Sequence, residues 1–188
     1  MAGQVYAIVS LLRGEARAEV LAIWDLLERR FGMRAARDSI HPHITYIVGD
    51  GDDLATLADC TAEAAAATPP LAITLDGLGV FAGPSPVLFM RVVRDQALAA
   101  THDRIIEAAR CAGLTPWPNY TPDTWVPHIT LALRDLPAQA LPDVLRALEG
   151  QRTRMRTTLV DLRLVRVMQP FSESFYIGTF PLGVSPAA

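Results

Sequence analysis

The feature that most constrains the fold is a tetrapeptide that the chain contains twice. Pro42–Thr45 reads Pro-His-Ile-Thr, and the same four residues recur at Pro127–Thr130, 85 positions later. Each copy leads into a run of β-branched and apolar residues, and such a run predicts a strand. Proline fits the first position of a strand and keeps the residue before it extended. Both copies are therefore expected at the start of a strand.

The order of the predicted elements supports a duplication. Hydrophobic periodicity and turn residues predict strands at 5–12, 43–48, 71–81, 87–93, 128–133, 155–168 and 175–182, and helices at 15–31, 54–67, 96–112 and 137–148. Asp76 and Asp161, each in a strand that follows a helix, are also 85 positions apart. We therefore expect two similar halves, about 5–83 and 86–168, within a single bilobal domain over residues 1–188.

A His-x-Thr sequence in a strand places two useful side chains on one face. Alternation points His43 and Thr45 the same way, roughly 6–7 Å apart at about 3.3 Å per residue. A phosphate group can span that gap and contact both side chains. His128 and Thr130 repeat the arrangement. If a pseudo-twofold axis brings the two strands together, one imidazole can take a proton from water while the other protonates a leaving oxygen. The pair predicts phosphodiester cleavage without a metal, with threonine hydroxyls on the non-bridging oxygens.

Composition and charge narrow the classes of function. All 17 positively charged residues are arginine, which excludes Schiff-base catalysis by lysine and a phosphate-loop lysine. A formal net charge of −3 argues against a large binding surface for duplex DNA. Cys60 and Cys111 are isolated, and we expect two buried free thiols. The sequence contains neither a signal-peptide pattern nor an apolar run of membrane length, so we expect a cytoplasmic protein without membrane contacts. No oligomer seam is evident, so we expect a monomer.

The two motifs resemble the paired signatures of a known family. His43-Ile44-Thr45-Tyr46 and His128-Ile129-Thr130-Leu131 are similar to the two His-x-Thr/Ser-x sequences of the 2H phosphoesterases. That superfamily includes the bacterial 2′-5′ RNA ligase-like proteins, which are RNA 2′,3′-cyclic phosphodiesterases. The resemblance extends from Val5 to about Leu182. It implies an α+β fold, bilobal and pseudo-twofold, in which two antiparallel sheets line a central cleft and helices pack outside.

The resemblance also implies a reaction. It implies hydrolysis of a 2′,3′-cyclic phosphate, on an RNA end or a small nucleotide, to a 2′-phosphate, without a metal or another cofactor. It leaves open a 2′-5′ RNA ligase activity. Carried over by motif, His43 and His128 are the catalytic pair, and Thr45 and Thr130 bind the phosphate. In the family the second-motif histidine activates water and the first protonates the leaving group. The alternative hypothesis is a module that binds a nucleotide or an RNA end in the same cleft without cleaving it.

One departure from the family pattern bears on substrate binding. Many bacterial members carry a basic residue five positions after the second-motif histidine. Here that position is Leu133, and Arg134 follows it. By alternation Arg134 shares a face with His128 and Thr130, so we expect its guanidinium to reach the cleft. The shift weakens the case for RNA as the substrate.

Aromatic residues near the second motif are further candidates for substrate binding. Trp125 and Tyr120 lie in the loop 113–127 that leads into the motif, and either ring can stack on a base. Packing of a proline-rich loop against the body explains them equally well. Phe81 follows Gly79 at the end of a predicted strand and is a similar candidate. Glycines within that strand predict a bulge or a close approach of the backbone.

The other two histidines have weaker functional interpretations. With His43 and His128, His41 can complete a metal site of three imidazoles, although no carboxylate stands at matching spacing. We favour an exposed position at the rim for His41. His102 lies in a predicted helix beside Asp103, and we expect it at the surface.

Overall fold

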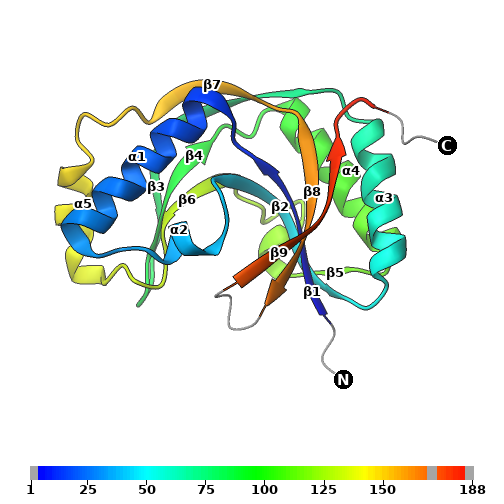
Figure 1. Ribbon diagram of the computed structural model, residues 1–188, viewed down its shortest axis with the longest axis horizontal. Coiled ribbons are helices and arrows are strands. Elements are labelled where there is room, and N and C mark those ends of the chain that lie inside the picture. The colour runs from blue at the N-terminus through cyan, green and yellow to red at the C-terminus, as the bar shows by residue number, and fades with distance from the viewer. Residues whose placement is uncertain (1–3, 169–172, 185–188) are drawn as a thin grey trace.

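Two antiparallel sheets form the middle of the molecule (Figure 1). The computed structural model describes residues 4–168 and 173–184. In this part of the chain one sheet has the strand order β5-β2-β1-β8-β9 and the other the order β6-β4-β3-β7. The strands are β1 (Gln4–Leu11), β2 (His43–Gly51), β3 (Leu71–Phe81), β4 (Val87–Val92), β5 (Thr115–Pro116), β6 (His128–Ala132), β7 (Arg154–Leu159), β8 (Asp161–Met168) and β9 (Glu173–Pro181). This arrangement confirms the expected α+β class with two antiparallel sheets.

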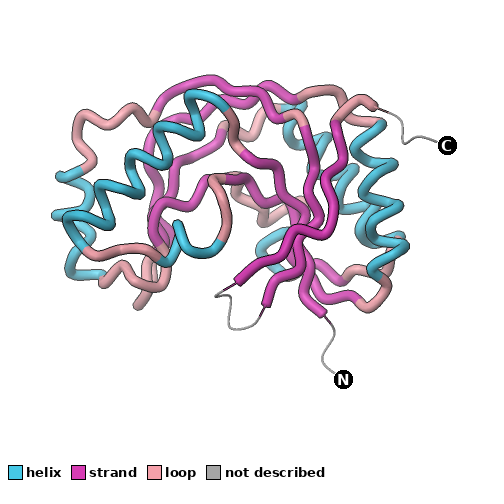
Figure 2. The backbone as a smooth tube through the Cα atoms, viewed as in Figure 1, coloured by secondary structure: helices cyan, strands magenta, loops and turns pink. Residues whose placement is uncertain are grey.

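Helices cover the outer sides of both sheets, and one short helix lies between them. The helices are α1 (Gly14–Phe31), α2 (Ala35–Ser39), α3 (Leu54–Ala66), α4 (Gln96–Cys111) and α5 (Leu141–Ala147), with 3₁₀ turns η1 (Pro118–Tyr120) and η2 (Ala138–Ala140). The labels in Figure 1 place α1 and α5 on one side of the strands, α3 and α4 on the other, and α2 in the middle, and Figure 2 shows the same arrangement. Within the described residues no helix is long and apolar enough to cross a membrane.

Each sheet takes strands from both predicted halves of the chain. The first sheet joins β1 and β2 of the first half to β5 and β8 of the second half and to the C-terminal β9, while the second sheet joins β3 of the first half to β4, β6 and β7 of the second. The helices cross over in the same way, because α1 packs against β6 and α4 packs against β2. The motif strands β2 and β6 also contact each other, although they belong to different sheets. The boundaries of the proposed repeat stay a prediction.

The strand β1 explains how the first sheet is buried on both faces. Tyr6 and Ile8 belong to the main core, while Ala7 and Val9 belong to a second apolar cluster. The second cluster is formed by Val5, Ala7, Val9, Leu11, Val48 and Val165. Because side chains alternate across the sheet, one face of β1 packs on the main core and the other forms this cluster. The second cluster becomes a wall of the candidate site.

One predicted strand is wrong, because the stretch 155–168 is two strands. β7 ends at Leu159 and β8 begins at Asp161, and the two belong to different sheets. The apolar and β-branched pattern continues through the crossing, so periodicity alone does not mark the change of sheet.

The short elements α2, β5 and η1 were also not predicted. Neither cysteine is buried as expected, since Cys60 is half-buried and Cys111 exposed, although both are free thiols.

Candidate functional site

The two motifs lie on strands with the same pattern of burial. In β2 and in β6 the histidine and the threonine are half-buried, and the isoleucine between them is buried. The four side chains His43, Thr45, His128 and Thr130 line a single cavity of about 370 Å³. The sequence prediction that each histidine shares a face with its threonine agrees with this geometry. The volume of this cavity lies within the range of small-molecule sites.

A β-bulge follows each motif at the same position. Along β1 the consecutive residues Ile8 and Val9 pair with Ile47 and Thr45, so Tyr46 is the extra residue of β2. Along β4 the consecutive residues Leu88 and Phe89 pair with Ala132 and Thr130, so Leu131 is the extra residue of β6. A bulge bends a strand and redirects its side chains, and bulges are common next to active sites. Both motifs therefore end at a local irregularity of the sheet.

Two tryptophans bind the backbone of the motifs. The indole N–H of Trp125 donates to the carbonyl oxygen of Thr45 at 2.9 Å, and that of Trp24 donates to the carbonyl oxygen of Thr130 at 3.2 Å. β6 is an edge strand, and along the first motif β2 pairs only with β1, because β5 covers only Gly49 and Asp50. The indole N–H groups therefore satisfy backbone carbonyl oxygens at sheet edges where no neighbouring strand is present to do so.

The two imidazoles are held in the same way. Nδ1 of His43 lies 2.8 Å from the carbonyl oxygen of His41, and Nδ1 of His128 lies 2.7 Å from that of Val126. A carbonyl oxygen only accepts, so in both rings Nδ1 carries the proton and donates it. In the neutral ring this leaves Nε2 with a lone pair. Both histidines are thereby fixed with Nε2 as the group that accepts or donates a proton in chemistry.

Burial controls the charge of both imidazoles. Desolvation, with a smaller contribution from the nearby His128, lowers the pKa of His43 to about 4, although the hydrogen bond to the carbonyl oxygen of His41 opposes this shift. Desolvation also lowers the pKa of His128. In the ligand-free protein both rings are therefore neutral near pH 7. A bound phosphate introduces negative charge close to both rings, and this favours protonation of one of them.

Aromatic rings surround His128 on the second sheet. Its ring centroid lies 5.1 Å from that of Phe81 and 5.1 Å from that of Phe89. The ring of Phe89 lies over Gly79, its partner on the neighbouring strand β3. A Cβ at position 79 would come within 2.4 Å of this ring, so a glycine is needed there. The strand also shows a register shift between Leu75 and Leu78, where Gly77 has φ 78°. The predicted bulge and close approach within this strand are confirmed.

The cavity has an apolar wall and a cationic end. The wall comes from the second apolar cluster and includes Ala7, Val9, Val48 and Val165. Arg134 lines the same cavity. It reaches the cavity from beyond the end of β6 at Ala132, through a backbone with φ 63°. A non-glycine residue in this left-handed region costs about 1–2 kcal/mol. Strand alternation is therefore not what brings Arg134 to the cleft.

A second cavity of about 440 Å³ adjoins the first on the side of the second sheet. Tyr120, His128, Thr130 and Leu133 line both cavities. Phe81 lines only the second one and is 38% exposed, so its ring is accessible. Burial raises the pKa of Tyr120 to about 12, so its hydroxyl stays protonated and can donate a hydrogen bond. The two aromatic candidates Phe81 and Tyr120 therefore both lie at a cavity that His128 lines.

Trp125 is engaged by the protein itself. It lines the second cavity, but it is only 3% exposed. Its ring is parallel to that of His102 at a centroid distance of 3.9 Å, and the guanidinium of Arg94 lies 5.8 Å from its centroid. Its N–H is bound to Thr45. These contacts correspond to the packing interpretation of the loop, and we do not propose Trp125 as a base-stacking ring.

The predicted surface position of His102 is wrong. Its side chain is fully buried, and Nε2 lies 3.0 Å from the carbonyl oxygen of Tyr46, the bulged residue of β2. Nε2 must donate in this contact, so His102 satisfies a carbonyl next to the first motif. Nδ1 is buried without a hydrogen-bond partner among the described residues. The helical pattern of the sequence does not reveal this role, because the contact spans 56 positions.

The burial of the His102 imidazole predicts that the folded protein loses stability in acid. Desolvation lowers its pKa in the folded protein to about 4, below the ordinary value of 6.5. The unfolded chain therefore binds more protons between these values. Stability is complete above about pH 6.5 and falls as the pH drops toward 4, by on the order of 2 kcal/mol. Urea unfolding of the wild type and His102→Gln across this range measures the effect. An equal pH dependence in the two proteins would contradict the assignment.

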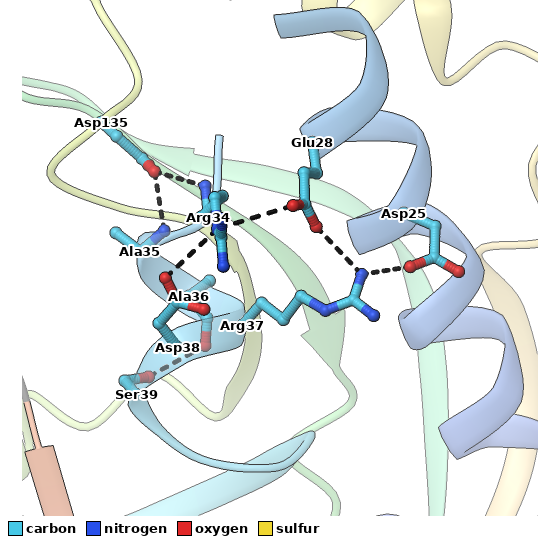
Figure 3. Close-up of polar contacts among 9 residues, drawn as sticks. All are labelled: Asp25, Glu28, Arg34, Ala35, Ala36, Arg37, Asp38, Ser39 and Asp135. Carbon is cyan, nitrogen blue, oxygen red and sulfur yellow. Dashed lines mark hydrogen bonds and ion pairs between the residues drawn. The ribbon is translucent and has the colours of Figure 1, made fainter. Parts of the chain in front are cut away.

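His41 and the neighbouring arginines have local partners. His41 is exposed and stacks against Tyr176 at a centroid distance of 6.5 Å. In residues 4–168 and 173–184 no group of three His, Cys, Asp or Glu side chains is arranged to hold a metal. Arg37 forms ion pairs with Asp25 and Glu28, and Arg34 pairs with Glu28 and Asp38 (Figure 3). These arginines connect α2 to α1.

Three residues at the site were not found from the sequence. Trp24 reaches the second motif from α1, Phe89 lies beside His128 from β4, and Asp135 binds the start of α2 (Figure 3). Each of these side chains contacts a residue that is either remote in the sequence or part of a neighbouring strand. A tryptophan in a helix and an aspartate after a strand carry no local signal of such contacts.

A family model described as the 2′-5′ RNA ligase superfamily matches residues 15–169. No curated protein matches the sequence.

Several solved structures have a similar fold. TT0787 of Thermus thermophilus is 19% identical with a TM-score of 0.63, over 95% of this chain and 98% of that chain. E. coli LigT complexed with 3′-AMP is 17% identical with a TM-score of 0.61, over 96% of this chain and 99% of that chain. The MHV ns2 PDE domain is 18% identical with a TM-score of 0.55, over 88% of this chain and 99% of that chain. At these identities the likeness concerns the fold.

Proposed function

The chain belongs to the 2′-5′ RNA ligase superfamily, the 2H phosphoesterases, and we propose that it hydrolyses a 2′,3′-cyclic phosphate on an RNA end or a nucleotide. The product is a 2′-phosphate, and the reaction needs no metal. The observation that carries the proposal is the single cavity lined by both motif histidines and both motif threonines. The LigT complex with 3′-AMP supports a nucleotide as the ligand of this fold.

The proposed reaction uses Nε2 of both histidines. Nε2 of one neutral ring takes a proton from water while the water oxygen forms a bond to phosphorus. The bond between phosphorus and the 3′ oxygen breaks, and Nε2–H of the other, protonated ring gives that oxygen its proton. By the family pattern His128 is the base and His43 the acid. The two rings exchange protonation states during the step, so return of a proton to the acid completes the cycle.

The remaining groups of the cavity act on the phosphate. The hydroxyls of Thr45 and Thr130 donate to the non-bridging oxygens, where negative charge develops in the transition state. Arg134 supplies positive charge at the same cavity. If the 5′ hydroxyl of a second RNA takes the place of water, the same steps form a 2′-5′ linkage. Ligase activity therefore needs no additional catalytic group.

A turnover assay tests the function. The four nucleoside 2′,3′-cyclic monophosphates are incubated with the protein in EDTA, and phosphorus NMR locates the phosphate of the product. We expect a 2′-phosphate and a bell-shaped pH dependence, because one ring must be neutral and the other protonated. A 3′-phosphate product, or activity that disappears in EDTA, would contradict the proposed mechanism.

One observation favours the alternative of a non-catalytic binding module. The pKa of His43 is about 4, so the free protein has no protonated imidazole there at neutral pH. A site of this kind can hold a phosphate through hydroxyls and Arg134 without an acid for the leaving group. Tight binding of the cyclic nucleotides without any product after long incubation, also at pH 5, would establish this alternative.

A further inference from the structure

The turn that carries Arg134 is held in an unusual backbone conformation. Arg134 has φ 63°, and it is the only non-glycine residue with positive φ among the described residues. The next amide, that of Asp135, donates to the carbonyl oxygen of Leu133 at 2.7 Å and closes the turn. L-residues rarely adopt this conformation, and where they do the surrounding structure must hold them. Contacts around this turn therefore decide whether the guanidinium stays at the cavity.

Asp135 provides such a contact. Its Oδ2 accepts the backbone N–H of Arg34 at 2.6 Å and that of Ala35 at 2.7 Å (Figure 3). These are the residues at the start of α2, about 100 positions away in the sequence. Hydrogen bonds to a carboxylate are stronger than those between neutral groups. One side chain thus connects the turn after the second motif to the helix before the first motif.

Both connected segments border the same cavity. Ala36, Ser39 and Ile40 line it from α2 and the residue after it, and Arg134 lines it from the turn. Asp135 follows Arg134 directly, so a shift of its carboxylate changes the backbone angles that aim the guanidinium. The carboxylate therefore couples the position of Arg134 to the α2 segment that lines the same cavity.

We propose that Asp135 is a positioning residue for Arg134 and that its carboxylate keeps the guanidinium directed at the phosphate. This inference rests on the proposed function, because it assigns Arg134 to the phosphate of the substrate. Asp135 itself lines neither of the two cavities. It acts through the backbone of the turn and through the start of α2.

A double-mutant cycle in binding and turnover tests the proposal. The variants are Arg134→Ala, Asp135→Ala and the combination of both, and the probes are adenosine 2′-monophosphate and inorganic phosphate, titrated by calorimetry. We expect each single variant to raise Kd and KM about tenfold while kcat changes much less, since a charged hydrogen bond to phosphate contributes at least that factor. We expect the double variant to bind no more weakly than Arg134→Ala alone, because both changes remove the same interaction.

A matched control separates the turn from the attachment of α2. Glu28→Gln weakens the ion pairs of Glu28 with Arg34 and Arg37, which also hold α2, but it leaves the turn unchanged (Figure 3). We expect its Kd to stay within twofold of the wild type. If Glu28→Gln weakens binding as much as Asp135→Ala, attachment of the helix sets the site and the proposal is wrong. A Kd for Asp135→Ala within twofold of the wild type, or additive effects in the double variant, would also overturn it.

The two proposals fail in different ways. Absence of turnover in the wild type removes the proposed function, while the binding cycle with phosphate still tests the role of Asp135. Wild-type protein that binds neither probe would overturn the positioning role. If Asp135→Ala does not fold, Asp135→Asn replaces it in the cycle. Asparagine keeps an acceptor oxygen for the two amides, so we expect it to restore part of the affinity, and an asparagine variant as weak as Arg134→Ala would count against the proposal.

Discussion

Replacement of His128 or His43 by alanine is expected to lower kcat by ~10²–10⁴-fold, the range of general acid or base catalysis. Each ring donates Nδ1–H to a backbone carbonyl and keeps Nε2 for proton transfer, so alanine removes the transferring atom itself. KM should change much less, because the threonine hydroxyls and Arg134 remain to bind the phosphate. Initial rates with a nucleoside 2′,3′-cyclic monophosphate in EDTA measure the effect.

His41→Ala is the matched control for these variants. His41 is exposed and two positions from His43, and its contact with His43 uses only the backbone carbonyl, which alanine retains. We expect it to keep kcat within a few-fold of the wild type. Circular dichroism should show an unchanged fold in all three variants. Full activity in either motif variant would rule out the two-histidine mechanism, and loss of activity in His41→Ala would revive a role for the third imidazole.

Replacement of Trp125 by alanine is expected to destabilise the protein by about 3–5 kcal/mol, the usual cost of truncating a buried tryptophan. The indole is 3% exposed, stacks on His102 and binds the carbonyl oxygen of Thr45. Its removal leaves a cavity and an unpaired carbonyl at the first motif. The free energy of unfolding in urea, followed by circular dichroism, measures the loss.

Trp125→Phe separates the hydrogen bond from the packing. Phenylalanine keeps an aromatic ring against His102 but lacks the N–H, so a smaller loss of about 1–3 kcal/mol is expected from the unpaired carbonyl. Activity should fall in this variant too, because Thr45 then lies on a less constrained strand. A Trp125→Ala variant within about 1 kcal/mol of the wild type would show that the ring is not part of the core.

The grouping of the motif side chains could be predicted because it depends on short-range geometry. The period of a strand places His43 with Thr45 and His128 with Thr130 on one face, whatever the rest of the chain does. The glycines within β3 predicted an irregular strand, and the structure has both a register shift and a close approach at Gly79. Arg134 was predicted at the cleft and lines it, but through a left-handed turn and not through alternation.

The sequence by itself determined most of the strands and helices and the side chains that share a face, because these follow from periodicity over a few residues. The class of fold was implied by the resemblance of the two motifs to a known family. Tertiary structure decided what the pattern leaves free. It placed Val160 at a crossing between sheets, buried His102 beneath Trp125, and set Asp135 at the start of α2. These contacts join residues tens to a hundred positions apart. They depend on how the sheets and helices pack, so no local pattern of residues specifies them.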